Sequence, residues 1–180
     1  NEGYSLAKII STRFCEYLNR ENNDFDYKTI IPCNLYGRYD TFDLNKSHMI
    51  PGVIKKISDA KKNKEKNVII WGDGSVRREF MYVEDLADFL WHAIENFEQI
   101  PQNINVGLGF DYSINEYYQI IADVIGYKGT FQYDFSKPVG MKQKLMDNSK
   151  LKDFGWKHKT TLKDGIIKTY AFFKKLKHDN

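Results

Sequence analysis

The sequence has little cysteine, little net charge and no long apolar run, and each shortage excludes a class of protein. Its 180 residues include two cysteines, too few for the disulfide framework of a small secreted domain. Cys15 falls in a helical pattern and Cys33 in a strand pattern, so we expect both to be buried thiols. No apolar stretch is long enough to cross a membrane, and no signal peptide opens the chain. We therefore expect a cytoplasmic protein without a membrane partner.

The charge and the composition also limit the partners. A formal net charge of +3 is too small to indicate nucleic acid, and the lysine-rich stretches 61–66 and 174–177 are typical of solvated faces. Hydrophobic residues make up 42% and charged residues 28%, as in an ordinary globular domain. The aromatic share of 15% suits either a core or a pocket lined by rings and does not choose between them. We expect no metal site.

Hydrophobic periodicity divides the chain into alternating helices and strands. Helical spacing predicts helices over residues 4–20, from a cap at Ser47, from residues 84–85, and over 113–125, 148–154 and 162–176. Extended runs predict strands at residues 27–31, 68–71, 79–83, 103–106 and 130–133, with a loop over 34–46. Strands that alternate with helices indicate an α/β fold.

Tyr4 and Lys8 form the most informative pair in the sequence. Four residues apart on a predicted helix, they share one face. A phenol beside an ammonium is an acid whose pKa is lowered, suited to exchanging a proton with a carbonyl oxygen. The spacing by itself is also that of an ordinary surface pair, so the chemistry depends on further motifs.

Gly107-Leu108-Gly109 follows a predicted strand and precedes a helix, as a dinucleotide-binding loop does. The third glycine of that fingerprint is absent, because Tyr112 stands in its place. We therefore interpret this segment as a plain turn rather than a phosphate-binding loop.

Several short motifs recur in one order along the chain. They are Gly3-Tyr4-Ser5-Leu6-Ala7-Lys8, Pro32-Cys33-Asn34-Leu35-Tyr36-Gly37, Ser47-His48-Met49-Ile50-Pro51, Trp71-Gly72-Asp73-Gly74, the run from Arg78 to Asp85, Ile104-Asn105-Val106-Gly107, Ser136-Lys137-Pro138-x-Gly140 and Lys144-Leu145-Met146-Asp147. In order and spacing the chain resembles the GDP-L-fucose synthases, which are extended short-chain dehydrogenase/reductases. The similarity covers essentially the whole chain.

This resemblance implies the C-terminal part of such an enzyme. Residues 1–46 and 81–109 would be the remainder of an NAD(P)-binding Rossmann domain, and residues 47–80 and 110–180 a small α/β substrate-binding domain. The glycine-rich N-terminal half of the Rossmann fold is absent from this sequence. We therefore expect the isolated chain to be inactive, and the full-length protein to act as a homodimer.

The resemblance also implies chemistry. The family reduces a GDP-4-keto-6-deoxy sugar with NADPH after inverting C3 and C5. Tyr4 would donate the proton to the carbonyl oxygen, and Lys8 would lower its pKa and hold the nicotinamide ribose. Pro32, Cys33, Asn34 and Leu35 would line the cofactor pocket together with Tyr4, Lys8 and His48. His48 would also be the acid or base of epimerisation, and its usual cysteine partner matches neither cysteine here.

The substrate contacts implied by the resemblance are Lys56, Trp71, Arg78 and Lys144. Arg78 suits a diphosphate because its planar guanidinium donates two bonds to oxygens. Lys56 stands where arginine is usual, and Trp71 could equally be a core residue at a strand end. Val139 is the clearest departure, because members of the family typically have an aspartate in this segment that meets the substrate, and valine accepts no hydrogen bond.

Three alternatives remain open at this point. The protein could be a reductase without epimerase activity. It could act as an epimerase, dehydratase or reductase on a related nucleotide sugar such as a GDP-heptose. As it stands, the chain could also be a non-catalytic fragment.

Overall fold

The computed structural model describes residues 2–178 and is an α/β structure whose strands pair mostly in parallel. The parallel pairs are β1 (Thr29–Pro32) with β6 (Asn103–Val106), β2 (Asn34–Tyr36) with β5 (Phe80–Tyr82), and β3 (Asn67–Trp71) with β8 (Thr130–Asp134). A three-stranded patch places β4 (Arg77–Arg78) between antiparallel β7 (Tyr112–Ser113) and parallel β9 (Gln143–Lys144). The predicted α/β class is confirmed.

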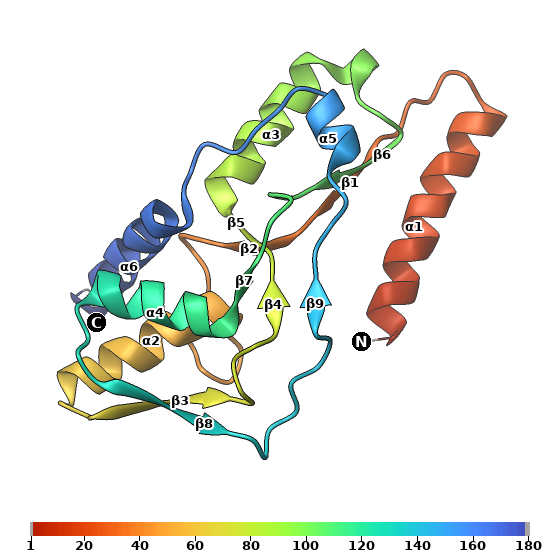
Figure 1. Cartoon of the computed structure of the whole chain (residues 1–180). Coiled ribbons are helices and arrows are strands. Elements are labelled where there is room, and N and C mark those ends of the chain that lie inside the picture. Colours follow the sequence, from red (N-terminus) through yellow and green to blue (C-terminus); the bar gives the residue numbers. More distant parts are fainter. Residues whose placement is uncertain (1, 179–180) are drawn as a thin grey trace.

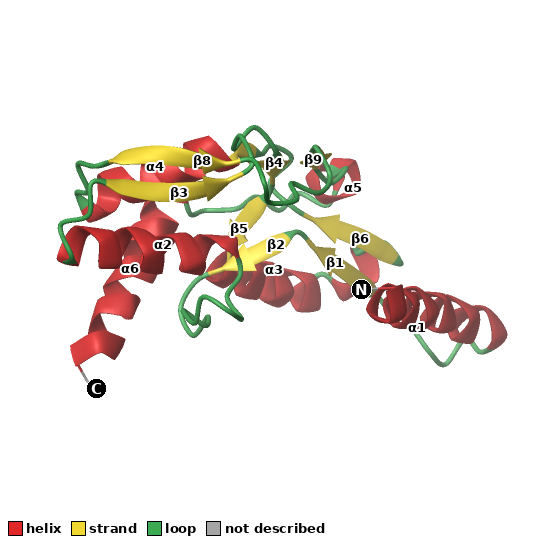
Figure 2. Ribbon diagram, turned by 90° about the horizontal axis from the view of Figure 1, so that it is seen from below, coloured by secondary structure: helices red, strands yellow, loops and turns green. Residues whose placement is uncertain are grey.

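Helices cover these strands. They are α1 (Glu2–Glu21), α2 (Met49–Lys62), α3 (Val83–Glu95), α4 (Ile114–Ile125), α5 (Ser149–Asp153) and α6 (Leu162–His178), with a 3-10 turn at Phe97–Gln99. Figure 1 and Figure 2 both show α1 on one flank, beside β1 and β6, and α6 on the opposite flank. None of the helices in the described chain is long and apolar enough to span a bilayer.

The larger core lies where α2, α4 and α6 meet. The predicted inward positions Val53, Ile54 and Ile57 of α2 are buried, and they join Ile121 and Ile166 in one cluster. Helix α4 has clear local signals at both ends. Ser113 forms a capping box with Glu116 at its start, and Gly126 ends it in the left-handed conformation at φ 72°.

A second core lies between the β1–β6 pair and helices α3 and α5. Met81, Phe89 and Val106 are fully buried there, and Trp156 closes the cluster with an edge contact of 5.3 Å between its ring centroid and that of Phe89. The strand predicted at residues 103–106 has those bounds in the structure.

Helix α1 forms as predicted, but its apolar positions are not covered. Among the described residues none of α1 is buried, and Ile10 and Phe14 are 65% and 61% exposed. The helix is attached near its C-terminal end, where Asn19 Nδ2 donates to the Tyr27 carbonyl over 2.9 Å. The expectation that Cys15 is buried is wrong, since this thiol is only half-buried, whereas Cys33 is buried as predicted.

Two local predictions are corrected. The segment predicted as a loop from residue 34 contains strand β2, because its backbone pairs with β5, a partner 46 residues further on (Asn34↔Phe80). The cap of α2 is His48 rather than Ser47. Ser47 lies just outside the helix, where its hydroxyl sits 2.8 Å from the position that a side chain on Gly52 would take.

Glu79 connects the segment after β6 to the segment after β9. Its side chain is 1% exposed, and one carboxylate oxygen accepts the Gly109 N–H over 2.9 Å while the other accepts the Met146 N–H over 3.1 Å. Asn34 Nδ2 donates to the Glu79 carbonyl over 2.8 Å. A buried carboxylate needs such donors, so these contacts fix both segments against β5.

We predict that Glu79→Gln lowers the free energy of unfolding by about 1–3 kcal/mol, because the amide would replace one acceptor oxygen with a donor facing an N–H. Urea denaturation of the variant measures this loss. Glu98→Gln, at an exposed site, is the matched control and should leave the stability unchanged. Equal urea midpoints for Glu79→Gln and the wild type would show that the hydrogen bonds of the Glu79 carboxylate contribute nothing to stability.

Candidate functional site

The predicted substrate residues Lys56 and Trp71 lie against each other. Strand β3 buries Val68 and Ile70 and leaves Trp71 58% exposed at its end, so Trp71 is not a core residue. The Lys56 ammonium lies 5.5 Å from the centre of the Trp71 ring and donates to the Ile69 carbonyl over 3.2 Å. Partial burial lowers the pKa of Lys56. An aromatic face with a cation above it is therefore presented to solvent.

The other two predicted substrate residues are also neighbours. Arg78 on β4 is in register with Lys144 on β9, so their side chains leave the same face of the patch. The preceding Arg77 is bound to the buried Asp111, with Nε 2.7 Å from Oδ1. Arg78 Nη1 donates to the Arg77 carbonyl over 2.7 Å, which uses one of the five donors of its guanidinium.

The segment from Lys137 to Gly140 joins the two pairs. Lys137 Nζ lies 5.8 Å from the centre of the Trp71 ring. A methyl group added at Gly72 would lie 2.0 Å from Val139 Cγ1, and one added at Gly140 would lie 3.8 Å from Arg78 Nη2. Residues 137–140 thus link Lys56 and Trp71 to Arg78 and Lys144, and we call these four residues together with Lys137 the cationic cluster.

Lys137 is a member of the cationic cluster that the sequence prediction omitted. The signal was present, because this lysine belongs to the Ser-Lys-Pro-x-Gly motif. Two lysines around a single exposed indole bring positive charge to a flat apolar surface, which is a combination suited to a ligand with both a ring and a phosphate.

His48 lies on the same helix as Lys56. It is the N-cap of α2, it is exposed, and within the described chain its side chain makes no capping hydrogen bond. His48 has extended backbone at φ −68° and ψ 171°, and it stands eight positions before Lys56 in the sequence. The imidazole is therefore exposed at the start of the helix that carries Lys56.

The predicted cofactor residues lie where β1 passes into β2. Pro32 is exposed, but Cys33 is buried, and burial together with the nearby Glu79 raises the pKa of its thiol to about 12. The side chain of Asn34 is bound to the Glu79 carbonyl, and Leu35 packs beside the second core. Cys33 therefore offers no reactive thiolate, and its backbone N–H is already donated to the Val106 carbonyl over 2.9 Å.

Tyr4 and Lys8 lie together on α1, with the ammonium 5.6 Å from the centre of the phenol ring. The structure does not bring this pair to the cationic cluster. Tyr4 is 69% exposed near the start of the helix, on the flank that stands apart in Figure 1 and Figure 2.

The loop after β6 contains the two glycines that resemble a dinucleotide fingerprint. The Gly109 N–H is already bound to Glu79, and a methyl group added at Gly107 would lie 2.5 Å from the same carboxylate oxygen. An internal anion thus occupies the place that a phosphate would need, which supports the interpretation of this segment as a turn.

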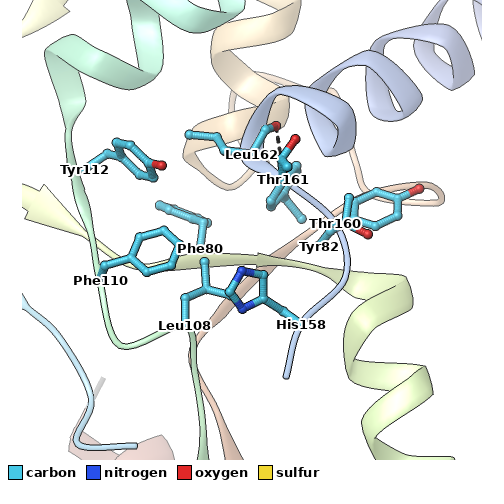
Figure 3. Close-up of a pocket in the computed structure, with 10 residues that line it drawn as sticks. Phe80, Tyr82, Leu108, Phe110, Tyr112, His158, Thr160, Thr161 and Leu162 are labelled. Carbon is cyan, nitrogen blue, oxygen red and sulfur yellow. Dashed lines mark hydrogen bonds between the residues drawn. The ribbon is translucent and has the colours of Figure 1, made fainter. Parts of the chain in front are cut away.

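A separate hollow lies behind the loop before α6, and none of the predicted site residues lines it. Figure 3 shows Leu108 between the rings of Phe110 and His158, with Thr160 and Thr161 on the other side of the hollow. The ring centres of Phe110 and His158 are 5.7 Å apart, and the cavity measures about 160 Å³. It is smaller than the usual cavity for a small-molecule ligand.

Comparison with known proteins identifies a family and several relatives of similar sequence. Residues 1–107 match the NAD dependent epimerase/dehydratase family. The chain is 63% identical over 173 residues to a GDP-L-colitose synthase of Yersinia pseudotuberculosis, and 47% identical over the same length to a GDP-L-fucose synthase of Azorhizobium caulinodans. These alignments cover 96% of the chain and 56% and 55% of the two relatives. The chain therefore spans just over half the length of the relatives it matches.

A solved structure shows the same fold. A GDP-mannoheptose C4 reductase of Campylobacter jejuni with NADP bound superposes with a TM-score of 0.81 at 31% identity, covering 94% of this chain and 59% of that one.

We predict that Cys33 resists alkylation by iodoacetamide at pH 8 in the folded protein. A rise in pKa from 9.0 to about 12 reduces the thiolate fraction by about a thousandfold, and the thiolate is the reactive form. Mass spectrometry of Cys15→Ala and Cys33→Ala, each with one cysteine left, measures the two rates. Labelling of Cys33 as fast in buffer as in urea would contradict this.

The raised pKa of Cys33 also makes the stability of the protein depend on pH. The folded state holds the Cys33 proton more tightly than the unfolded state, so this contribution to stability is complete below about pH 9 and is lost as the pH rises toward about 12. Cys33→Ala should therefore show a smaller loss of stability between those pH values than the wild type.

Proposed function

The chain belongs to the NAD dependent epimerase/dehydratase family, and we propose that it is the catalytic and substrate-binding part of an NADPH-dependent reductase of GDP-4-keto-6-deoxy sugars. The observation that carries this proposal is the cationic cluster, in which Lys56 and Lys137 flank the exposed indole of Trp71 and Arg78 is paired in register with Lys144. The proposal includes inversion of C3 and C5 in the same site. It also includes the division into a Rossmann part, residues 1–46 and 81–109, and a substrate part, residues 47–80 and 110–180.

The chemistry of the cationic cluster suits a GDP-sugar. Arg78 and Lys144 would bind the diphosphate, because charge-assisted bonds from a guanidinium are strong and directional. Trp71 offers a flat face to guanine or to the sugar ring, with Lys56 and Lys137 supplying charge beside it. The two separate cores follow the proposed division only in part, because Leu151 and Trp156 join the core of the first part and Tyr36, Phe42 and Tyr82 join that of the second.

Tyr4 and Lys8 would carry out the proton transfer of the reduction. NADPH, when bound, supplies the hydride that attacks the C4 carbonyl carbon. The phenol of Tyr4 donates a proton to the carbonyl oxygen, and the ammonium of Lys8 stabilises the phenolate that remains. The exposed, adjacent pair fits the nicotinamide ribose, whereas the loop at Gly109 offers no place for the pyrophosphate.

The proposal therefore requires a further part of the fold. The uncovered apolar side chains of α1, such as Ile10 and Phe14, fit a helix that packs against additional strands. Those strands would bring Tyr4 toward the substrate and bind the rest of the cofactor. In this arrangement the full-length protein would act as a cytoplasmic homodimer, while this chain alone would bind NADPH poorly.

His48 is proposed as the acid or base of epimerisation. Its imidazole is exposed at the start of α2 and is not used in capping within the described chain. Imidazole suits proton exchange near neutral pH at the carbons beside a ketone.

Two alternatives to this substrate or reaction are each supported by one of the comparisons. The identity of 63% to a GDP-L-colitose synthase favours the GDP-sugar from which GDP-L-colitose is made. The similarity to a GDP-mannoheptose C4 reductase favours reduction without epimerisation.

We predict that Tyr4→Phe in the complete enzyme reduces kcat by about 10² to 10⁴, because the variant removes only the proton donor. NADPH consumption measures the rate, and NADPH titration should give an unchanged Kd. Tyr17→Phe, on the same helix and 56% exposed, is the matched control. Near-normal turnover by Tyr4→Phe would exclude this tyrosine as the donor.

We further predict that His48→Gln slows proton exchange more than hydride transfer. Deuterium uptake from heavy water at the carbons beside the ketone should fall at least tenfold, whereas reduction of a substrate that is already epimerised should fall less. Mass spectrometry of the product separates the two steps. Unchanged deuterium uptake would assign His48 a purely structural role.

A further inference from the structure

We propose that Asp111 is a positioning residue for the diphosphate contact, because it holds β9 against β4 and thereby places Lys144 beside Arg78. This inference rests on the proposed function, in which those two cations bind the diphosphate of a GDP-sugar. It gives a role in ligand binding to a buried carboxylate that lies outside the cationic cluster.

The carboxylate of Asp111 joins two strands that are far apart in the sequence. The residue is 8% exposed, and its Oδ1 accepts a hydrogen bond from Arg77 Nε over 2.7 Å. Its Oδ2 accepts one from Gln143 Nε2, also over 2.7 Å. Arg77 lies on β4 and Gln143 on β9, so one side chain spans both strands. A second acid, Glu116, lies 3.5 Å from Arg77 Nη1, so the contact specific to Asp111 is the one to β9.

The two residue pairs across β4 and β9 differ in what their side chains contact. Each strand has two residues, which pair as Arg77 with Gln143 and as Arg78 with Lys144. Asp111 binds the side chains of the first pair. Because successive residues of a strand point to opposite faces, the second pair lies on the other face of the patch. Asp111 therefore acts on Lys144 only through its neighbour.

Strand β4 is fixed on its other side, whereas β9 is exposed along its length. The Arg78 carbonyl accepts the Tyr117 hydroxyl over 2.9 Å, and β7 pairs with β4 on that side. Strand β9 lies at the edge of the patch, after the long connection from β8 (Figure 1), and residues 135–145 are all exposed. Burial does not hold this segment, so its position depends on hydrogen bonds such as that from Gln143 to Asp111.

The expected effect on binding follows from the loss of one cation. If β9 moves away from β4, Lys144 no longer faces the same diphosphate as Arg78. Loss of one charge-assisted hydrogen bond weakens binding by roughly 10- to 100-fold. The proton donor Tyr4 lies on a different element, α1, so KM for the GDP-sugar should rise while kcat stays nearly unchanged.

The test measures GDP binding to the complete enzyme by calorimetry. Asp111→Ala removes both acceptors and should raise the Kd of GDP by roughly 10- to 100-fold. Gln143→Ala removes only the bond to β9 and should raise the Kd in the same direction. Asp111→Asn should retain most of the affinity, because its amide oxygen accepts from Arg77 while its NH₂ group donates to a Gln143 amide that has turned over.

Two matched controls separate positioning from a general loss of stability. Asp85 is also buried, at 4% exposed, but its carboxylate accepts from Thr160 in the segment before α6. Asp85→Ala should lower the free energy of unfolding as Asp111→Ala does, yet leave the Kd of GDP unchanged. Gln119→Ala, at an exposed position of α4, is the control for Gln143→Ala and should also leave the Kd unchanged.

A double-mutant cycle tests the link to Lys144 directly. Lys144→Ala should weaken GDP binding strongly in the wild type but much less in Gln143→Ala, where the lysine is already displaced. Additive effects of the two substitutions would overturn the inference, because a purely structural Gln143 would not change what Lys144 contributes. NADPH consumption with a GDP-4-keto-6-deoxy sugar gives the accompanying rise in KM.

The outcomes separate this inference from the proposed function. If Arg78→Ala and Lys144→Ala weaken GDP binding but Asp111→Ala and Gln143→Ala do not, the positioning role is wrong and the proposed function stands. If neither Arg78→Ala nor Lys144→Ala weakens it, the diphosphate contact of the proposed function is wrong and the inference with it. Should Asp111→Ala fail to fold, Gln143→Ala still decides, since it changes an exposed residue.

Discussion

The buried carboxylate of Glu79 is the contact on which the geometry of the candidate site depends. It lies at the junction of β4 and β5 and accepts backbone N–H groups from Gly109 and Met146. A buried carboxylate is tolerated only when its oxygens are bonded, so the two segments are held in place by the same requirement. The segment that contains Gly109 follows strand β6, and the segment that contains Met146 follows Lys144. The position of Lys144 beside Arg78 is therefore linked to a residue that is not itself exposed to ligand.

Two further acids act in the same way on neighbouring segments. Asp111 is 8% exposed and binds Arg77 and Gln143, which joins β4 to β9. Asp85 is 4% exposed and accepts the hydroxyl of Thr160 over 3.0 Å, which fixes the segment before α6. Because successive residues of a strand point to opposite faces, the bond that directs Arg77 toward Asp111 leaves Arg78 on the other face of the strand. An ion pair with Asp111 thus separates the directions of two adjacent arginines.

Helix α1 is held less firmly than the strands that carry Arg78 and Lys144, because its apolar side chains are uncovered. Tyr4 and Lys8 have the right spacing and lie in contact, but the helix that carries them touches the described chain mainly near its other end. A proton donor acts only when it is held within hydrogen-bond reach of the reacting oxygen. The proposed function therefore depends on additional structure that would pack on Ile10 and Phe14 and bring the pair to the sugar.

The sequence by itself determined the features that depend on near neighbours in the chain. The helix from Ser113 to Gly126 was predictable because its cap and its terminal glycine act within one turn, and the strand at residues 103–106 because its pattern is local. The order of the motifs likewise predicts site roles for His48, Trp71 and Arg78. Only the tertiary structure decided that residues 34–36 form a strand, that Trp71 is exposed between Lys56 and Lys137, and that the apolar stripe of α1 is uncovered. These features depend on partners far away in the chain, and a local pattern records that a side chain is apolar but not what covers it.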